Sequence, residues 1–244
     1  MNGARSYMQR GTRFCTRSKD LWIEYAKLEM IYLAKIALRR SILGLDVDRS
    51  SKEDTEAVEG ATEDPGFATS ADMIAIPAFN TNALRPSMIE GVKVDTEAAK
   101  DPMTTPALNG AIPLAIFDAA RKQPFFSPAA AEDFFVMFSA FPQVRCLPNI
   151  LQHVLDCMTE LYPADACTCN CYTRQPIVDI EPTSADFPAA LGVALDRMKE
   201  SKAKVKDKKE LSRKSKAWVE SVMAVEELDP GIQTVLKHTL RKLE

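Results

Sequence analysis

Residues 4–44 decide the fold class of this chain, and they read ARSYMQRGTRFCTRSKDLWIEYAKLEMIYLAKIALRRSILG. Within them, Trp22, Tyr25 and Glu29 lie three and four residues apart, which places their side chains on one face of a helix. Ser18 stands just before this helix and belongs to a residue type that caps helix N-termini. The stretch therefore predicts an amphipathic helix with aromatic residues on its buried face.

A second helix is expected ahead of it, over residues 4–14. Its small and apolar residues share one face: Ala4, Tyr7, Met8 and Gly11. We expect this face to pack against a preceding segment, so that the chain is the later part of a longer protein. After the Trp22 helix, the basic segment 36–43 is expected as a short helix of its own, ending at Gly44.

The rest of the chain predicts more helices and no strand. Apolar residues recur at helical spacing, with cap residues and prolines between the segments, over 112–121, 130–141, 148–162, 166–175 and 187–199. Two further helices contain Trp218 and Leu236, and Trp218 repeats the aromatic position of Trp22. Segment 46–80 differs, because it is rich in acids and lacks periodicity, and it predicts a flexible acidic insert. Short loops between so many helices suit either a compact bundle or a stack of helical repeats.

The overall composition excludes some classes of protein. The 244 residues carry a formal net charge of -3 and a pI near 5.6, so the chain is not uniformly basic like many nucleic-acid binders. No apolar run approaches the ~20 residues that span a bilayer. The first residues also lack the apolar core of a secretory signal. We therefore expect an intracellular protein that does not enter a membrane.

The pattern in residues 4–44 resembles a known family. Trp-x-x-Tyr-x-x-x-Glu at Trp22, Tyr25 and Glu29, after a helix with Ala4-Arg5 and a later Gly11, is similar to the HAT (half-a-TPR) repeat. The 4–44 string resembles the HAT-repeat subunits of the UtpB subcomplex of the small-subunit processome, which associate with U-three small nucleolar RNA. The resemblance implies an all-α fold, an α-solenoid of antiparallel helix pairs.

The resemblance also implies a domain organisation and roles for particular residues. Residues 1–45 would form a HAT repeat region with a partial first repeat, followed by the insert 46–80 and by degenerate helical repeats over 81–244. Trp22, Tyr25, Glu29 and Trp218 would pack between neighbouring helices and interlock them. The small residues Ala4 and Gly11 would allow neighbouring helices to approach closely.

The implied function is structural. The chain would be a non-catalytic scaffold of a nucleolar pre-ribosomal complex that supports pre-18S rRNA processing. It would contact β-propeller (WD-repeat) subunits, and pre-ribosomal RNA and the small nucleolar ribonucleoprotein are possible partners; it would need no cofactor and no small-molecule substrate. Two alternatives stay open: a HAT-repeat scaffold of a splicing or 3′-end processing complex, and a compact helical ligand-binding or enzyme domain.

Two clusters in the sequence contain residue types that can bind a metal ion or a nucleic acid. Cys167, Cys169 and Cys171 alternate, whereas structural zinc sites pair cysteines at wider spacing, so we interpret them as reduced thiols rather than metal ligands. Lysines and arginines are concentrated in Lys202, Lys204, Lys206, Lys208, Lys209, Arg213, Lys214 and Lys216. These basic residues are predicted either to contact RNA or serve in nuclear import, or to form a solvated linker before the Trp218 helix.

Enzyme activity has little support in the sequence. The chain has two histidines, His153 and His238, and it contains none of the glycine-rich phosphate loops or nucleophile motifs typical of enzymes. We therefore predict no catalytic residue and no metal site.

Overall fold

The structure is a computed structural model, and it describes residues 2–43 and 105–243. The described residues form helices joined by turns and contain no strand, which confirms the all-α prediction for this part of the chain. The elements in chain order are α1 (Asn2–Phe14), α2 (Lys19–Ile42), α3 (Ala111–Ala120), α4 (Pro128–Ser139), α5 (Leu147–Leu161), α6 (Ala166–Arg174), the short 3-10 helix η3 (Gln175–Ile177), α7 (Phe187–Lys204), α8 (Lys208–Met223) and α9 (Pro230–Leu243).

Local sequence explains where several helices begin. Ser127 accepts a hydrogen bond from the backbone N–H of Ala130, and Pro128 occupies the first turn of α4. Asp165 caps α6 by accepting from the N–H of Cys167 at 2.8 Å. Asp207 caps α8 in the same way. Each cap satisfies a backbone donor that the helix itself leaves unpaired.

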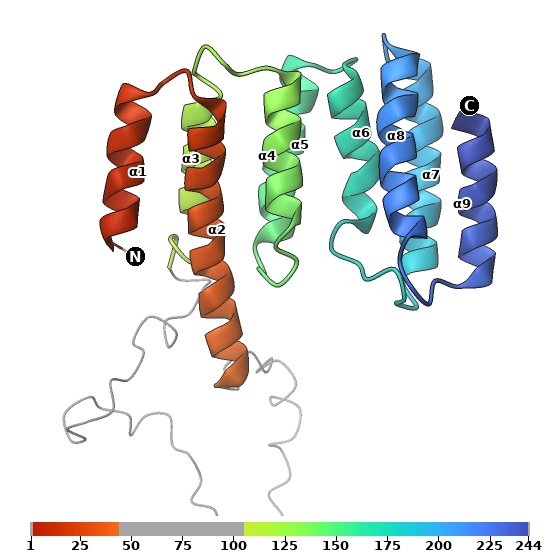
Figure 1. Cartoon of the computed structure of the whole chain (residues 1–244), viewed down its shortest axis with the longest axis horizontal. Helices are drawn as coiled ribbons and strands as arrows, with labels where there is room; N and C mark the ends of the chain where they lie inside the picture. Colours follow the sequence, from red (N-terminus) through yellow and green to blue (C-terminus); the bar gives the residue numbers. More distant parts are fainter. Residues whose placement is uncertain (1, 44–104, 244) are drawn as a thin grey trace, which may run out of the picture.

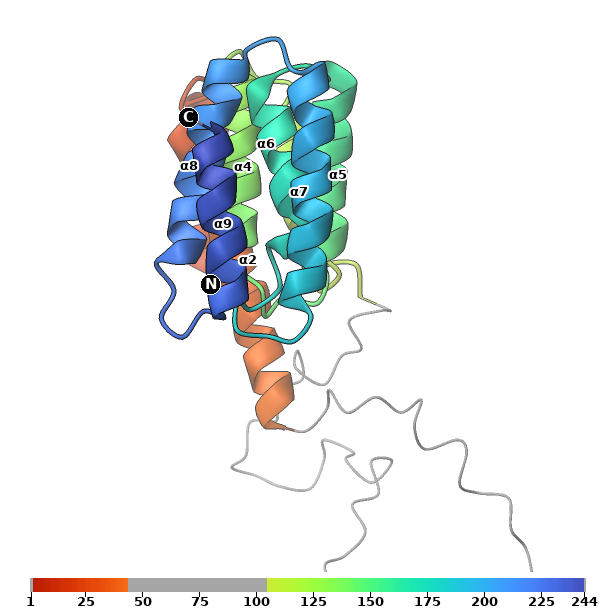
Figure 2. The same cartoon turned by 90° about the vertical axis from the view of Figure 1, so that its right-hand side faces the viewer.

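The helices stand side by side in a row, with α1 at one end and α9 at the other (Figure 1). α2, α4, α6 and α8 follow one another, and each packs on the next in this order; α3 and α5 also pack together. The helices α2, α4, α6 and α8 form one layer, and α3, α5 and α7 lie behind them in a second layer. Consecutive helices pack across the two layers, with α2 on α3, α4 on α5 and α6 on α7. Seen from the end of the row, the two layers lie side by side, and the helices of each layer lie behind one another (Figure 2). Each described helix therefore packs mainly on helices that are near it in the sequence.

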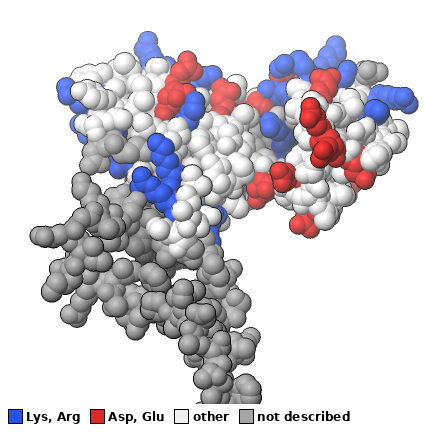
Figure 3. All heavy atoms as spheres, turned by 60° about the horizontal axis from the view of Figure 1, so that its bottom comes forward, with Lys and Arg blue, Asp and Glu red and all other residues white. Residues whose placement is uncertain are grey.

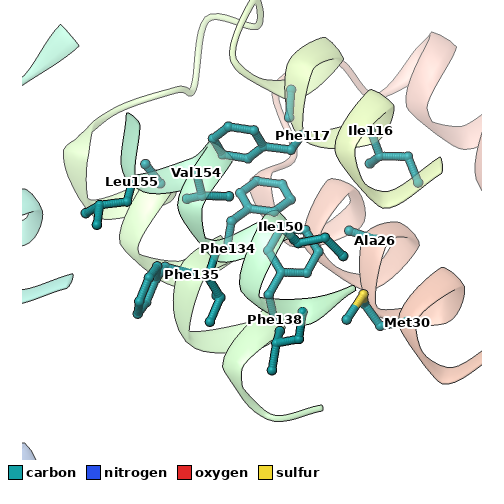
Figure 4. Packing of buried hydrophobic residues seen from close by; sticks show 14 of the residues in the cluster. Ala26, Met30, Ile116, Phe117, Phe134, Phe135, Phe138, Ile150, Val154 and Leu155 are labelled. Atoms are coloured by element: carbon teal, nitrogen blue, oxygen red, sulfur yellow. The ribbon is translucent and has the colours of Figure 1, made fainter. Parts of the chain in front are cut away.

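The apolar interior follows this order. Residues of α2 to α6 build one cluster around Phe117, Phe134 and Phe138, which are fully buried. Figure 4 shows these rings between α2, α3, α4 and α5, with Ala26 and Met30 of α2 closing one side. Residues of η3, α7, α8 and α9 build a second cluster that contains Phe187, Trp218 and Leu236. Burial of each large apolar side chain contributes roughly 1.5–3 kcal/mol to the free energy of unfolding. Both clusters therefore stabilise the row.

Two boundary predictions were wrong. Segment 36–43 is not a separate helix, because α2 runs without interruption from Lys19 to Ile42. No glycine or proline stands between Tyr32 and Ile36, and Ile36 continues the buried stripe of α2. The helix that starts at Phe187 extends to Lys204 instead of 199, so the expected linker is partly helix. The predicted acidic insert 46–80 and the start of segment 81–244 lie outside the described residues.

Candidate functional site

The contact between α1 and α2 is centred on a buried ion pair. Glu29 of α2 is only 1% exposed, and Arg5 of α1 donates to both of its carboxylate oxygens, at 2.6 and 2.5 Å. The Arg5 guanidinium also lies over the ring of Tyr32, 5.4 Å from its centre. The hydrogen bond to Glu29 is the main reason that the pKa of Arg5 is raised. A two-point contact of this kind fixes the orientation of one helix against the other as well as their distance.

The other residues assigned to packing in the N-terminal helices have different surroundings. Trp22 and Tyr25 are buried, and the Trp22 ring lies 6.4 Å from that of Phe125, in the turn between α3 and α4. At Gly11 a Cβ atom would meet the side chain of Leu21 at 3.2 Å, so α1 approaches α2 closely there. Ala4 is exposed, and the close approach expected at this position is not seen. It lies on the side of α1 that no other described helix covers.

Trp218 lies in the second apolar cluster and is 4% exposed. Its neighbour Ser221, which replaces the tyrosine of the aromatic pattern, donates its hydroxyl to the carbonyl of Trp218 at 2.7 Å. Trp218 thus packs among α7, α8 and α9, as a buried aromatic residue without the tyrosine and glutamate that accompany Trp22.

A second polar contact, between α4, α6 and α8, was not predicted. Glu132 of α4 is 7% exposed and accepts from Asn170 of α6 at 2.8 Å and from Lys214 of α8 at 2.6 Å. Burial lowers the pKa of Lys214, but the hydrogen bond and the charge of Glu132 raise it more, so the lysine stays charged. The signal in the sequence was an acid, Glu132, three residues before the buried Phe135 and therefore on the same side of the helix.

The alternating cysteines do not face one common point. Cys167 and Cys171 belong to the large cluster of α2 to α6, whereas Cys169 packs with Val205 and Leu211 in a small separate cluster. Burial raises the pKa of all three thiols, which therefore stay protonated. Within the described ranges, no group of three His, Cys, Asp or Glu side chains could hold a metal ion.

The basic residues of the run 202–216 divide into two groups. Lys214 holds Glu132, and Arg213 forms a two-point contact with Glu210 on the same helix, which lowers the pKa of Glu210 to about 2. Lys216 also has a partner. By contrast, Lys204, Lys206, Lys208 and Lys209 are exposed and form no ion pair with other described residues. They lie in the last turn of α7, the turn 205–207 and the first turn of α8, so the expected solvated linker is limited to residues 205–207.

The ends of three helices bring these lysines together with others. Lys202 donates to the backbone carbonyl of Lys242, which joins the C-terminal ends of α7 and α9. Arg241 and Lys242 are exposed at this place. We call the resulting surface the basic edge; its residues are Lys204, Lys206, Lys208, Lys209, Arg241 and Lys242.

The opposite end of the C-terminal helices is acidic. The turns 175–186 and 224–229 lie there, at the bottom of the row in Figure 1, and they contain no lysine or arginine. Their exposed acids are Asp179, Glu181, Asp186, Glu226, Glu227 and Asp229. Figure 3, with the bottom turned forward, shows acidic residues gathered over this face and basic residues along the far rim. The two edges thus have opposite charge.

An apolar groove of about 660 Å³ lies between the second half of α2 and the turn from α4 to α5. Its lining includes Leu38, Val144 and Phe141, with Lys35 and Arg145 among the polar residues. Among the described residues, neither a carboxylate nor a histidine lines it.

None of the described helices is both long and apolar enough to cross a membrane. No protein-family model matches the chain, and no curated protein matches it.

Proposed function

We propose that this chain is a non-catalytic scaffold of the HAT type, built as an α-solenoid of antiparallel helix pairs. The observation that carries the proposal is the packing of each described helix on its near neighbours in the sequence, with Glu29 of α2 holding Arg5 of α1. In a repeat protein each unit needs the next one to cover its apolar face, and long surfaces stay open along the row. Such a surface acts by holding partners at fixed positions.

The identity of the assembly rests on the sequence of residues 4–44. Their resemblance to the HAT-repeat subunits of the small-subunit processome favours a nucleolar pre-ribosomal complex that supports pre-18S rRNA processing. β-propeller subunits of the same subcomplex, together with pre-ribosomal RNA and the small nucleolar ribonucleoprotein, are the proposed partners. The two edges of opposite charge support this proposal, since partners of opposite charge would be directed to different sides of one scaffold.

The test is affinity purification of the tagged full chain from cell extract, with the RNA retained and both proteins and transcripts identified. We expect WD-repeat proteins, pre-18S transcripts and U-three small nucleolar RNA. Spliceosomal RNAs or 3′-end processing factors in their place would assign the chain to an mRNA-processing scaffold. Recovery of neither kind of assembly would contradict the proposal.

A pair of matched variants tests whether the recovery of partners depends on the α1–α2 contact. Arg5→Glu places two acids at the α1–α2 contact and is expected to reduce the recovery of partners, whereas Lys27→Glu changes an exposed residue of α2 by the same charge. Equal recovery by both variants would argue against a role of the α1–α2 unit in the assembly.

A further inference from the structure

We propose that the basic edge binds the phosphate backbone of single-stranded RNA. This inference rests on the proposed function for the assembly in which the RNA would be met, and it names the surface that would meet it. It is carried by the position and exposure of Lys204, Lys206, Lys208 and Lys209, and by the absence of ion pairs between them and other described residues.

The arrangement of these lysines is unfavourable for the stability of the fold. Lys204, Lys206, Lys208 and Lys209 repel one another, and Lys208 and Lys209 stand in the first turn of α8, where the helix dipole disfavours cations. Acids nearby do not neutralise them, because Asp207 caps α8 and Glu210 is engaged by Arg213. Folding gains nothing from this cluster, whereas a polyanion would release its counterions on meeting it.

The basic edge lies at one end of a line of turns that follows the row of helices. The turns α1–α2, α3–α4, α5–α6 and α7–α8 all lie on the same side of the row, at the top of Figure 1. A hydrogen bond from the backbone N–H of Lys206 to the carbonyl of Ala164 joins the last two turns. Exposed Lys122, Arg17 and Arg13 add positive charge nearer to α1, whereas the α5–α6 turn between them and the basic edge contains Asp165 and no lysine or arginine. With helices 8–10 Å apart, the row α2, α4, α6 and α8 spans roughly 30 Å, which suits a linear polyanion.

An exposed aromatic ring on the same side of the row favours RNA over an acidic protein segment. Phe14 is 83% exposed between Arg13 and Arg17, and an exposed aromatic ring beside arginines is a platform on which an unpaired base stacks. A peptide partner would need an apolar pocket for an anchor side chain. The apolar groove, however, lies at the turn from α4 to α5, away from this edge.

The experiment measures binding of the purified full chain to a fluorescently labelled, mixed-sequence 30-nucleotide single-stranded RNA at several salt concentrations. The variant K204E/K208E/K209E removes three phosphate contacts. We expect its affinity at 100 mM salt to fall on the order of tenfold or more, and the slope of log K against log salt to decrease in magnitude by about 2. Phe14→Ala is expected to weaken binding about tenfold with an unchanged slope.

The matched control is K27E/K35E/K237E, which makes the same change of net charge on the flanks of α2 and α9. It should keep the affinity and the slope of the wild-type chain, and circular dichroism should show equal helicity for all variants. Equal losses in both triple variants would overturn the inference. So would polyglutamate that competes as well as RNA, because the edge would then accept any acidic chain.

The outcome is separable from that of the proposed function. If the purified chain fails to bind RNA while the tagged chain still recovers pre-ribosomal proteins, the inference fails and the scaffold proposal stands. If the chain binds RNA through the basic edge but recovers no pre-ribosomal component, the inference stands and the proposed assembly is wrong.

Discussion

Glu29 is a charged side chain at a fully buried position, and its surroundings explain why it is tolerated there. Arg5 satisfies both carboxylate oxygens, so the charge is paired and hydrogen-bonded at the same time. Removal of one member of such a pair is costly because the other is left without its partner in a position of low solvation. The identity of residue 29 therefore matters more to the α1–α2 contact than that of an exposed acid on the same helix.

We expect Glu29→Gln to lower the free energy of unfolding by about 2 kcal/mol, since Arg5 is partly exposed and regains some solvation. Glu24→Gln breaks only an exposed pair with Lys27 and should change it by less than about 0.5 kcal/mol. Urea denaturation followed by circular dichroism provides the comparison. Equal effects of the two substitutions would show that the buried pair does not stabilise the contact.

The cysteines are predicted to differ sharply in reactivity. Cys15 is exposed, whereas the other five are buried, and burial raises the pKa of Cys146, Cys167, Cys169 and Cys171. Because the thiolate is the reactive form, a disulfide reagent at pH 8 should modify Cys15 rapidly and the others only as the chain unfolds. Cys15→Ser should abolish the rapid phase; rapid modification of the 167–171 segment in this variant would contradict the described burial.

At the scale of elements, the sequence predicted the helices well and their partners poorly. Pro148 and Pro163 mark the ends of α5 to within one or two residues, because these signals are local. The split of α2 before Ile36 had no breaker residue to justify it. Glu132 and Lys214 are 82 positions apart, so the sequence shows an acid in an apolar stripe but not the lysine that neutralises it. Likewise, the sequence shows that the run 202–216 is basic, but it does not show which of these residues form ion pairs within the molecule.

The contact of α4, α6 and α8 through Glu132 gives a prediction at this scale. Lys214→Met leaves the buried carboxylate with Asn170 alone and should cost about 2–3 kcal/mol of unfolding free energy. Lys209→Met, an exposed change on the same helix, should alter it by less than about 0.5 kcal/mol. Chemical denaturation is the measurement. If Glu132→Gln in the Lys214→Met background restored no stability, the cost would have to come from lost packing instead of the unpaired charge.

On the scale of the whole molecule, the described helices form a row in which the two large apolar clusters belong to different helices. If the row is a repeat architecture, as we propose, truncation of a core residue in one cluster is expected to leave the other cluster stable, because each repeat is stabilised mainly by its immediate neighbours. A compact domain with one interior loses stability everywhere when any large core residue is truncated. This difference in response is what the scaffold account depends on, since only a row of locally supported helices keeps long surfaces open to partners.

Native-state hydrogen exchange of Leu236→Ala tests this claim most directly. Leu236 of α9 is fully buried, and its truncation should cost about 2–5 kcal/mol; Val235→Ala, at a largely exposed neighbouring position, is the control. We expect amide protection in Leu236→Ala to fall in α7, α8 and α9 and to be retained in α2 to α5. A uniform loss of protection from α2 to α9 would contradict it.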